Sequence, residues 1–213
     1  MPTSKPFSHV EFLISASALD GLPPADLPEI AFVGRSNVGK SSALNALANR
    51  RRLAFVSKTP GRTQLINFFT LGENARLVDL PGYGYAKVPH GMRDEWGALI
   101  GGYLQQRMGL LGVVSIMDAR RPFTPLDQQL MAWLKPLNRK VLVLLSKADK
   151  LTRSEQGRTL RAAQASLNAA GVSGACLLFS SVKHQGVEET RALIEGWLAG
   201  TDTVSAAAQA RAE

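Results

Sequence analysis

A short apolar run, a glycine-rich octapeptide and a helical pattern follow one another near the start of this chain. The apolar run spans residues 30–33, and the helical pattern spans 40–49, with Leu44 and Leu47 three residues apart. Between them, residues 34–41 read GRSNVGKS, which is two glycines followed by lysine and serine. Glycine permits the tight turn in which successive backbone N–H groups face phosphate oxygens. The sequence therefore predicts a phosphate-binding loop between a strand and a helix.

The residue types of this loop have distinct expected roles. Lys40 would reach the β- and γ-phosphates of a nucleotide, and the Ser41 hydroxyl would coordinate Mg²⁺. The helix that begins there adds the positive end of its dipole. The nucleotide-binding residues predicted in this segment are Gly34, Arg35, Ser36, Asn37, Val38, Gly39, Lys40, Ser41 and Ser42.

The rest of the chain alternates strand-like and helical segments. Strand-like runs span 64–71, 75–80, 111–117, 140–145 and 175–179, and helical patterns span 92–108, 124–134, 154–170 and 187–199. This alternation predicts a three-layer α/β domain with a six-stranded, mostly parallel sheet, in which the hairpin 64–80 supplies one antiparallel edge. We interpret 1–27 as an N-terminal extension, 28–199 as the nucleotide-binding domain, and 200–213 as a disordered tail or a frayed helix end.

A second motif, Asp79-Leu80-Pro81-Gly82, follows a strand-like run. It lies where α/β folds bind ligands, at the carboxyl end of a strand. Asp79 would approach Mg²⁺ through water, and the N–H of Gly82 is suited to contact a γ-phosphate. A phosphate loop alone fits kinases, ATPases and GTPases, and this second motif favours a nucleoside triphosphate switch.

A third motif, Ser146-Lys147-Ala148-Asp149, indicates which base is bound. The Asp149 carboxylate can accept hydrogen bonds from N1–H and N2–H₂ of guanine, which adenine does not offer in that pattern. The stem of Lys147 can lie over the base while its ammonium group meets carbonyls of the phosphate loop. A further segment, Phe179-Ser180-Ser181, also follows a strand-like run and could support the guanine. Together the motifs predict a site for GTP and GDP.

In their order and spacing, these segments resemble the EngB (YihA/YsxC) family of bacterial GTPases, from about Phe7 to Leu198. The matching stretches are GRSNVGKSS, GRTQLINFF, DLPGYGYA, SKAD and FSSVKHQG. The resemblance implies that Thr63 is a switch threonine over Mg²⁺ and the γ-phosphate. It also adds Gly61, Arg62, Gln64 and Leu65 to the nucleotide-binding residues. Lys40, Thr63 and Gly82 are then the expected catalytic set.

Three positions qualify the expected activity. Tyr83 stands where Ras-like proteins carry a water-orienting glutamine, so we expect slow hydrolysis. Asn37 either helps to hold a K⁺ ion against the phosphates, as in potassium-activated relatives, or is an ordinary loop side chain. Ser146 departs from the Asn or Thr that relatives more often carry, and its reach is shorter, whereas guanine specificity stays with Asp149.

The charge balance bears on the partner. The chain has 25 Lys and Arg against 17 Asp and Glu, a net charge of +8, which attracts polyanions. The densest basic run is Arg50-Arg51-Arg52 with Lys58 and Arg62, which is either a solvated face or a surface for RNA. The resemblance implies the large ribosomal subunit or its rRNA as partner, and a need for the protein in cell division and septation.

Two other functions remain open from the residues. One is a GTP-dependent switch that acts directly on the division machinery without contact to RNA. The other is a small-molecule kinase, which would show no preference for guanine, and the third motif argues against it. The single cysteine, Cys176, favours a reducing compartment, and the sequence shows no signal peptide and no long apolar run, so we expect a cytoplasmic protein without a membrane anchor. We also expect a monomer that takes no small-molecule co-substrate.

Overall fold

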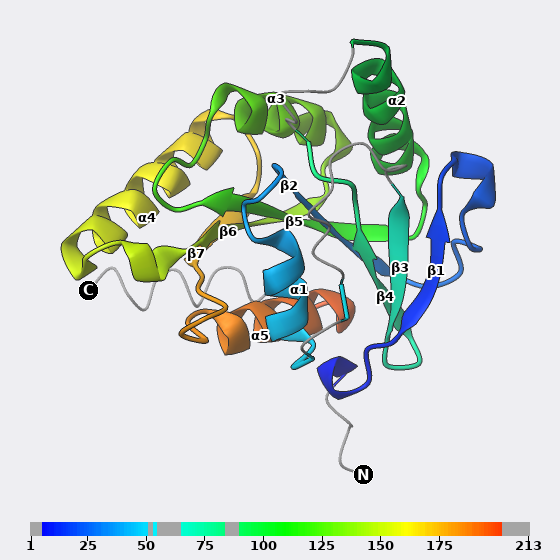
Figure 1. The fold of residues 1–213 in the computed structure, drawn as a ribbon, viewed down its shortest axis with the longest axis horizontal. Coiled ribbons are helices and arrows are strands. Elements are labelled where there is room, and N and C mark those ends of the chain that lie inside the picture. The colour runs from blue at the N-terminus through cyan, green and yellow to red at the C-terminus, as the bar shows by residue number, and fades with distance from the viewer. Residues whose placement is uncertain (1–5, 51–52, 55–64, 84–89, 202–213) are drawn as a thin grey trace.

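The fold was analysed in a computed structural model, which describes residues 6–50, 53–54, 65–83 and 90–201. Its seven-stranded sheet has the order β1-β3-β4-β2-β5-β6-β7 (Figure 1). The strands are β1 (Phe12–Ala16), β2 (Glu29–Gly34), β3 (Ile66–Leu71), β4 (Ala75–Asp79), β5 (Leu110–Asp118), β6 (Lys140–Ser146) and β7 (Gly174–Leu178). The helices are α1 (Lys40–Leu47), α2 (His90–Gln106), α3 (Pro125–Leu134), α4 (Arg153–Ala169) and α5 (Val187–Leu198).

The sheet is parallel except around β3. Strands β4, β2, β5, β6 and β7 are parallel neighbours, whereas β3 runs antiparallel to both β4 and β1. The predicted α/β class, with antiparallel pairing at one edge, is therefore confirmed. The sheet has one strand more than the six that the sequence predicts. The additional strand, β1, lies in the segment interpreted as an N-terminal extension and pairs with the open side of β3.

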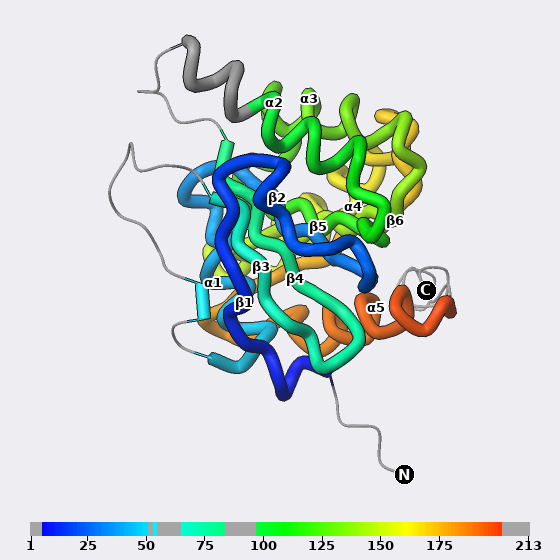
Figure 2. The backbone as a smooth tube through the Cα atoms, turned by 90° about the vertical axis from the view of Figure 1, so that its right-hand side faces the viewer, coloured from blue at the N-terminus to red at the C-terminus, as the bar shows by residue number. Residues whose placement is uncertain are grey.

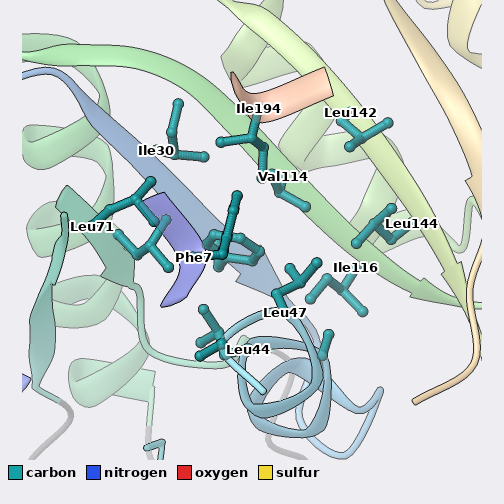
Figure 3. Close-up of a cluster of buried hydrophobic side chains, with 14 of the residues drawn as sticks. Phe7, Ile30, Leu44, Leu47, Leu71, Val114, Ile116, Leu142, Leu144 and Ile194 are labelled. Atoms are coloured by element: carbon teal, nitrogen blue, oxygen red, sulfur yellow. The ribbon is translucent and has the colours of Figure 1, made fainter. Parts of the chain in front are cut away.

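Helices cover both faces of the sheet, α1 and α5 on one and α2, α3 and α4 on the other (Figures 1 and 2). The central parallel strands are buried along their length, so alternate residues enter two separate cores. Figure 3 shows the core beneath α1 and α5, to which the helices contribute Leu44 and Ile194 and the sheet contributes Ile30 and Val114. Phe7, from the short 3₁₀ turn Pro6–Ser8, joins this core.

A buried carboxylate, Glu29, lies at the start of β2, the end of the sheet opposite the carboxyl ends of the parallel strands. Its Oε2 accepts hydrogen bonds from the Tyr103 hydroxyl at 2.8 Å and from Arg107 Nε at 2.9 Å. Burial of a carboxylate is costly unless it is paired, and this guanidinium supplies the pair. The arrangement joins the end of α2 to the first strand of the parallel sheet.

No helix in the described parts of the chain has the length and apolar character that crossing a bilayer requires.

Candidate nucleotide-binding site

The predicted phosphate loop connects β2 to α1 at the carboxyl end of the parallel sheet. A Cβ atom on Gly34 would lie 2.7 Å from the Ile116 carbonyl oxygen, so only glycine fits beside β5. Asn37 and Gly39 have φ values of 63° and 102°, in the left-handed region. The backbone N–H of Ala43 then donates to the Gly39 carbonyl at 2.9 Å, within the first turn of α1. The loop therefore turns sharply and leads directly into a helix N-terminus.

The second predicted motif lies against this loop. The Leu80 N–H donates to the Phe32 carbonyl at 2.9 Å, and two further backbone bonds join Tyr83 to the loop. In the first, the Tyr83 N–H donates to the Gly34 carbonyl at 3.2 Å; in the second, the Ser36 N–H donates to the Tyr83 carbonyl at 2.9 Å. These bonds place Gly82 directly beside the phosphate loop.

Lys40 and Asp79 form an ion pair that is largely buried, with side-chain exposures of 11% and 9%. The lysine comes from the first residue of α1 and the carboxylate from the last residue of β4. Ser41 and Ser42 occupy the same first turn of α1, where Ser41 is half-buried and Ser42 is exposed. The predicted phosphate-binding cation and the predicted acid thus lie together at one end of the sheet.

The third predicted motif is joined to the phosphate loop by its side chains. At the end of β6, the Ser146 hydroxyl donates to the Val38 carbonyl at 2.6 Å, and it lies 3.0 Å from the Met117 carbonyl. Lys147 Nζ donates to the Asn37 carbonyl at 2.8 Å. Two consecutive residues of β6 and its following turn therefore hold two consecutive carbonyls of the loop.

Asp149 faces the segment that follows β7. The Ser180 hydroxyl donates to Asp149 Oδ1 at 2.6 Å, and the Ala148 N–H donates to the Phe179 carbonyl at 3.1 Å. The hydrogen bond from Ser180 lowers the pKa of the Asp149 carboxyl below its ordinary value. Phe179 and Ser180 are buried, and Ser181 is half-buried. The carboxylate is thus held ionised, which is the form that accepts hydrogen bonds.

The structure therefore brings three predicted motifs and the segment 179–181 together at one end of the sheet. Leu80 and Pro81 are buried in the connection between Asp79 and Gly82, and Leu65 stands directly before β3. Four predicted residues, Gly61, Arg62, Thr63 and Gln64, lie outside the described residues. Among the described residues, no cluster of three His, Cys, Asp or Glu side chains could hold a metal ion.

Two carboxylates near the site were not among the predicted residues. Asp118, at the end of β5, accepts hydrogen bonds from Arg120 Nε at 2.9 Å and lies 3.1 Å from Lys147 Nζ. The bond from Arg120 holds the pKa of this carboxyl well below its usual range. The second is Asp127, whose Oδ1 accepts a 2.8 Å hydrogen bond from the Tyr83 hydroxyl. The spacing of Thr124 and Asp127 indicates the start of a helix, but no neighbouring residue indicates that Asp127 contacts Tyr83.

The chain was compared with known families and proteins. A family model described as "50S ribosome-binding GTPase" matches residues 29–147. A "Probable GTP-binding protein EngB" from Aromatoleum aromaticum is 53% identical over 192 residues, which is 90% of this chain and 89% of the relative. The protein of the same name from Thiobacillus denitrificans is 52% identical over 205 residues, 96% of this chain and 98% of the relative.

Solved structures resemble the fold at lower identity. The crystal structure of a probable GTP-binding protein engB matches with a TM-score of 0.63 at 21% identity, over 81% of this chain and 99% of that one. Era in complex with MgGDPNP and nucleotides 1506–1542 of 16S ribosomal RNA matches with a TM-score of 0.59 at 21% identity, over 82% of this chain and 56% of that one. At such identities the two matches show the fold alone.

Proposed function

This chain belongs to the EngB family of GTP-binding proteins, which are P-loop GTPases, and we propose that it controls a partner through the nucleotide it holds. It binds GTP and GDP with Mg²⁺, hydrolyses GTP slowly, and joins the assembling large ribosomal subunit in one nucleotide state. One observation carries the proposal: side chains of the predicted base motif donate to phosphate-loop carbonyls, Ser146 to Val38 at 2.6 Å and Lys147 to Asn37 at 2.8 Å. Base recognition and phosphate recognition are thereby parts of one site.

In this proposal the base is guanine. Asp149 is held by Ser180 with its carboxylate ionised, so it accepts hydrogen bonds from the N1–H and N2–H₂ groups of guanine. Adenine presents no such pair of donors. The stem of Lys147 lies along the base plane while its ammonium group stays on the Asn37 carbonyl.

The phosphate end has the donor set that Mg²⁺ prefers. This ion binds few protein ligands, mostly oxygen atoms, and completes its shell with phosphates and water. Ser41 would supply the direct hydroxyl ligand, Asp79 would act through water, and Thr63 would add a ligand in the GTP state. The ion neutralises charge on the phosphates when bound. Lys40, paired with Asp79 beside it, would contact the β- and γ-phosphates.

Hydrolysis is proposed to be slow because residue 83 offers no side chain to the attacking water. Tyr83 is 4% exposed, and its hydroxyl is bonded to Asp127 inside the protein. A monovalent cation would then stabilise the charge that develops on the phosphates in the transition state, which the Tyr83 side chain does not do. We propose that Asn37 helps to hold K⁺ there, since its exposed side chain belongs to the phosphate loop itself.

The large ribosomal subunit or its rRNA is proposed as the partner on three grounds. The matching family model carries the description "50S ribosome-binding GTPase". The net charge of +8 favours a polyanion. A protein of the same fold, Era, has been crystallised with nucleotides 1506–1542 of 16S ribosomal RNA, which belongs to the small subunit, so this match supports binding to ribosomal RNA and not the choice of subunit. Loss of the protein would then impair cell division and septation through defective ribosome assembly, and the protein would act in the cytoplasm as a monomer without a membrane anchor.

Co-sedimentation with purified large subunits tests this proposal. The full chain is mixed with subunits in the presence of a non-hydrolysable GTP analogue or of GDP, at low and at moderate salt. We expect the analogue to support binding that survives moderate salt, and GDP to support much less. Binding that ignores the nucleotide and disappears with salt would show charge attraction alone. A direct action on the division machinery would then be the better explanation.

A further inference from the structure

One buried carboxylate, Asp127, collects four polar contacts from three parts of the fold. The side chain is fully buried. Its Oδ1 accepts the 2.8 Å hydrogen bond from the Tyr83 hydroxyl and lies 3.3 Å from Arg35 Nε. Its Oδ2 accepts bonds from the Thr124 N–H at 2.9 Å and the Thr124 hydroxyl at 2.7 Å, which close the capping box of α3. The carboxylate therefore joins α3 to residues from both nucleotide-binding segments.

Arg35 and Tyr83 are also neighbours through their backbones. The two residues form a parallel β-bridge beyond the ends of β2 and β4. The Tyr83 N–H donates to the Gly34 carbonyl, and its carbonyl accepts from the Ser36 N–H. Bridge partners present their side chains on the same face, and here both side chains contact the Asp127 carboxylate. The backbone bridge and the side-chain contacts thus restrain the same pair of residues.

Gly82 is the residue that this arrangement positions. It immediately precedes Tyr83, and a Cβ atom on it would lie 3.3 Å from Ser36 Oγ. Glycine by itself has no side chain that could fix its orientation, so its N–H direction depends on how its neighbours are held. The Tyr83 N–H bond to the Gly34 carbonyl restrains the Gly82–Tyr83 peptide, which is adjacent to the peptide that carries the Gly82 N–H. The buried ring and hydroxyl of Tyr83 resist rotation of this segment away from the loop.

We propose that Asp127 is a positioning residue for recognition of the γ-phosphate, acting through Tyr83 and Arg35 on the Gly82 N–H. This inference rests on the proposed GTPase function. The γ-phosphate is present in GTP and absent from GDP, so a displaced Gly82 N–H weakens binding of the triphosphate more than of the diphosphate. Position 83 therefore contributes its anchored backbone rather than a catalytic side chain, which explains why a tyrosine serves there.

The test removes one hydroxyl with Tyr83→Phe and compares it with Tyr103→Phe. The two tyrosines are matched, because each is buried, each donates a 2.8 Å hydrogen bond to a buried carboxylate, and each carboxylate also pairs with an arginine. They differ in location, since Tyr103 contacts Glu29 at the opposite end of the sheet. Removal of either hydroxyl should lower the melting temperature by a similar amount.

The nucleotide readout separates the two variants. Dissociation constants for a fluorescent non-hydrolysable GTP analogue and for fluorescent GDP are measured with the full chain. We expect Tyr83→Phe to raise the dissociation constant of the GTP analogue about tenfold and to change that of GDP by no more than about twofold. Tyr103→Phe should leave the ratio of the two constants unchanged. Equal ratios in both variants, or an equal loss of GDP and analogue affinity in Tyr83→Phe, would overturn the proposal.

A second variant tests the carboxylate itself. Asp127→Asn keeps an oxygen acceptor for Thr124 and removes the charge that faces Arg35. We expect the ratio of the dissociation constants for the analogue and for GDP to change in the same direction as in Tyr83→Phe. A variant that carries both substitutions should show nearly the same ratio as Asp127→Asn alone, because both substitutions act on one contact. Fully additive effects would contradict this. Failure of the unmodified chain to bind either nucleotide would overturn the proposed function instead.

Discussion

The Ser146 hydroxyl donates to the Val38 carbonyl oxygen, which is 2.6 Å away and belongs to a residue 108 positions earlier in the chain. The family resemblance leads one to expect Asn or Thr at this position, and serine has a shorter reach. The structure shows how it reaches. A Cβ atom on Gly39 would lie 4.0 Å from Ser146 Cβ, so the loop passes close to the end of β6. Because the loop lies this close to β6, the short side chain of Ser146 is long enough to reach the Val38 carbonyl.

Ser146→Ala should therefore loosen the loop as a whole. We expect affinity for GDP and for a GTP analogue to fall together, by about three- to tenfold, because the loop contacts phosphates common to both. The free energy of unfolding should fall by about 1 kcal/mol. Isothermal titration with both nucleotides and urea unfolding measure the two effects. Ser166→Ala, which removes an exposed hydroxyl from α4, serves as the control. Unchanged affinities in Ser146→Ala would show that the bond does not shape the loop.

The motifs around the site could be predicted because each is contained in a few consecutive residues. The spacing of glycine, lysine and serine in residues 34–41, between an apolar run and a helical pattern, predicts a turn followed by a helix from local sequence alone. Asp79 and Asp149 follow apolar runs, and the carboxyl ends of parallel strands meet at one edge of a sheet. The sequence alone is therefore sufficient to predict that these residues meet.

Other features depend on partners far away in the chain. Tyr83 and Asp127 are separated by 44 residues, and the capping box of α3 accounts locally for Asp127 without reference to Tyr83. Strand β1 has no alternating pattern and forms because β3 offers an open edge. Phe12 packs edge-on against Phe69 at 5.9 Å across that pairing. Long-range pairing of this kind leaves no signal within the segment itself.

Potassium should accelerate GTP hydrolysis through Asn37. We expect the single-turnover rate to be about tenfold or more higher in KCl than in NaCl at equal ionic strength. Asn37→Gly is the appropriate variant, because φ of this residue is 63° and glycine adopts that conformation without strain. The variant should hydrolyse GTP at the same rate in both salts while it still binds GDP. Equal rates in the two salts for the unmodified chain would contradict the role of Asn37.

The buried thiol of Cys176 should make stability fall in mild alkali. Burial raises the pKa of this thiol to about 12 in the folded protein, against about 8.5 in the unfolded chain. Above pH 8.5 the unfolded state therefore binds fewer protons than the folded state, and the free energy of unfolding decreases as pH rises. The loss from this group should reach about 1.4 kcal/mol at about pH 9.5.

Comparison with Cys176→Ala isolates that contribution. Other groups titrate in the same range, so the quantity of interest is the difference between the two stability curves from pH 7 to pH 10. We expect the difference to shrink as the pH rises. Native Cys176 should also react with a thiol reagent roughly a thousand times more slowly than the unfolded chain at pH 8. Parallel stability curves, or rapid labelling of the folded protein, would show that the thiol is not shielded.

Gly112 in β5 should not tolerate a methyl group. A Cβ atom there would lie 2.5 Å from Trp197 Cζ3, and this tryptophan is 2% exposed in the core beneath α5. Gly112→Ala should lower the free energy of unfolding by about 3 kcal/mol. Gly101→Ala in α2 is the matched control, because no described atom outside its own helix backbone lies within 4 Å of the added carbon. That variant should be neutral or stabilised by up to about 1 kcal/mol. Equal denaturation midpoints for the two variants would contradict this packing.

Exchange of the base preference by Asp149→Asn tests the guanine site most directly. The unmodified chain should bind GDP far more tightly than XDP, because the ionised carboxylate accepts from the two donors of guanine. In Asp149→Asn an amide replaces one acceptor with a donor that suits the additional carbonyl of xanthine. We expect the variant to lose about 10- to 100-fold in affinity for GDP and to prefer XDP. A variant that still binds GDP as tightly as the unmodified chain, and that ignores XDP, would show that Asp149 does not read the base.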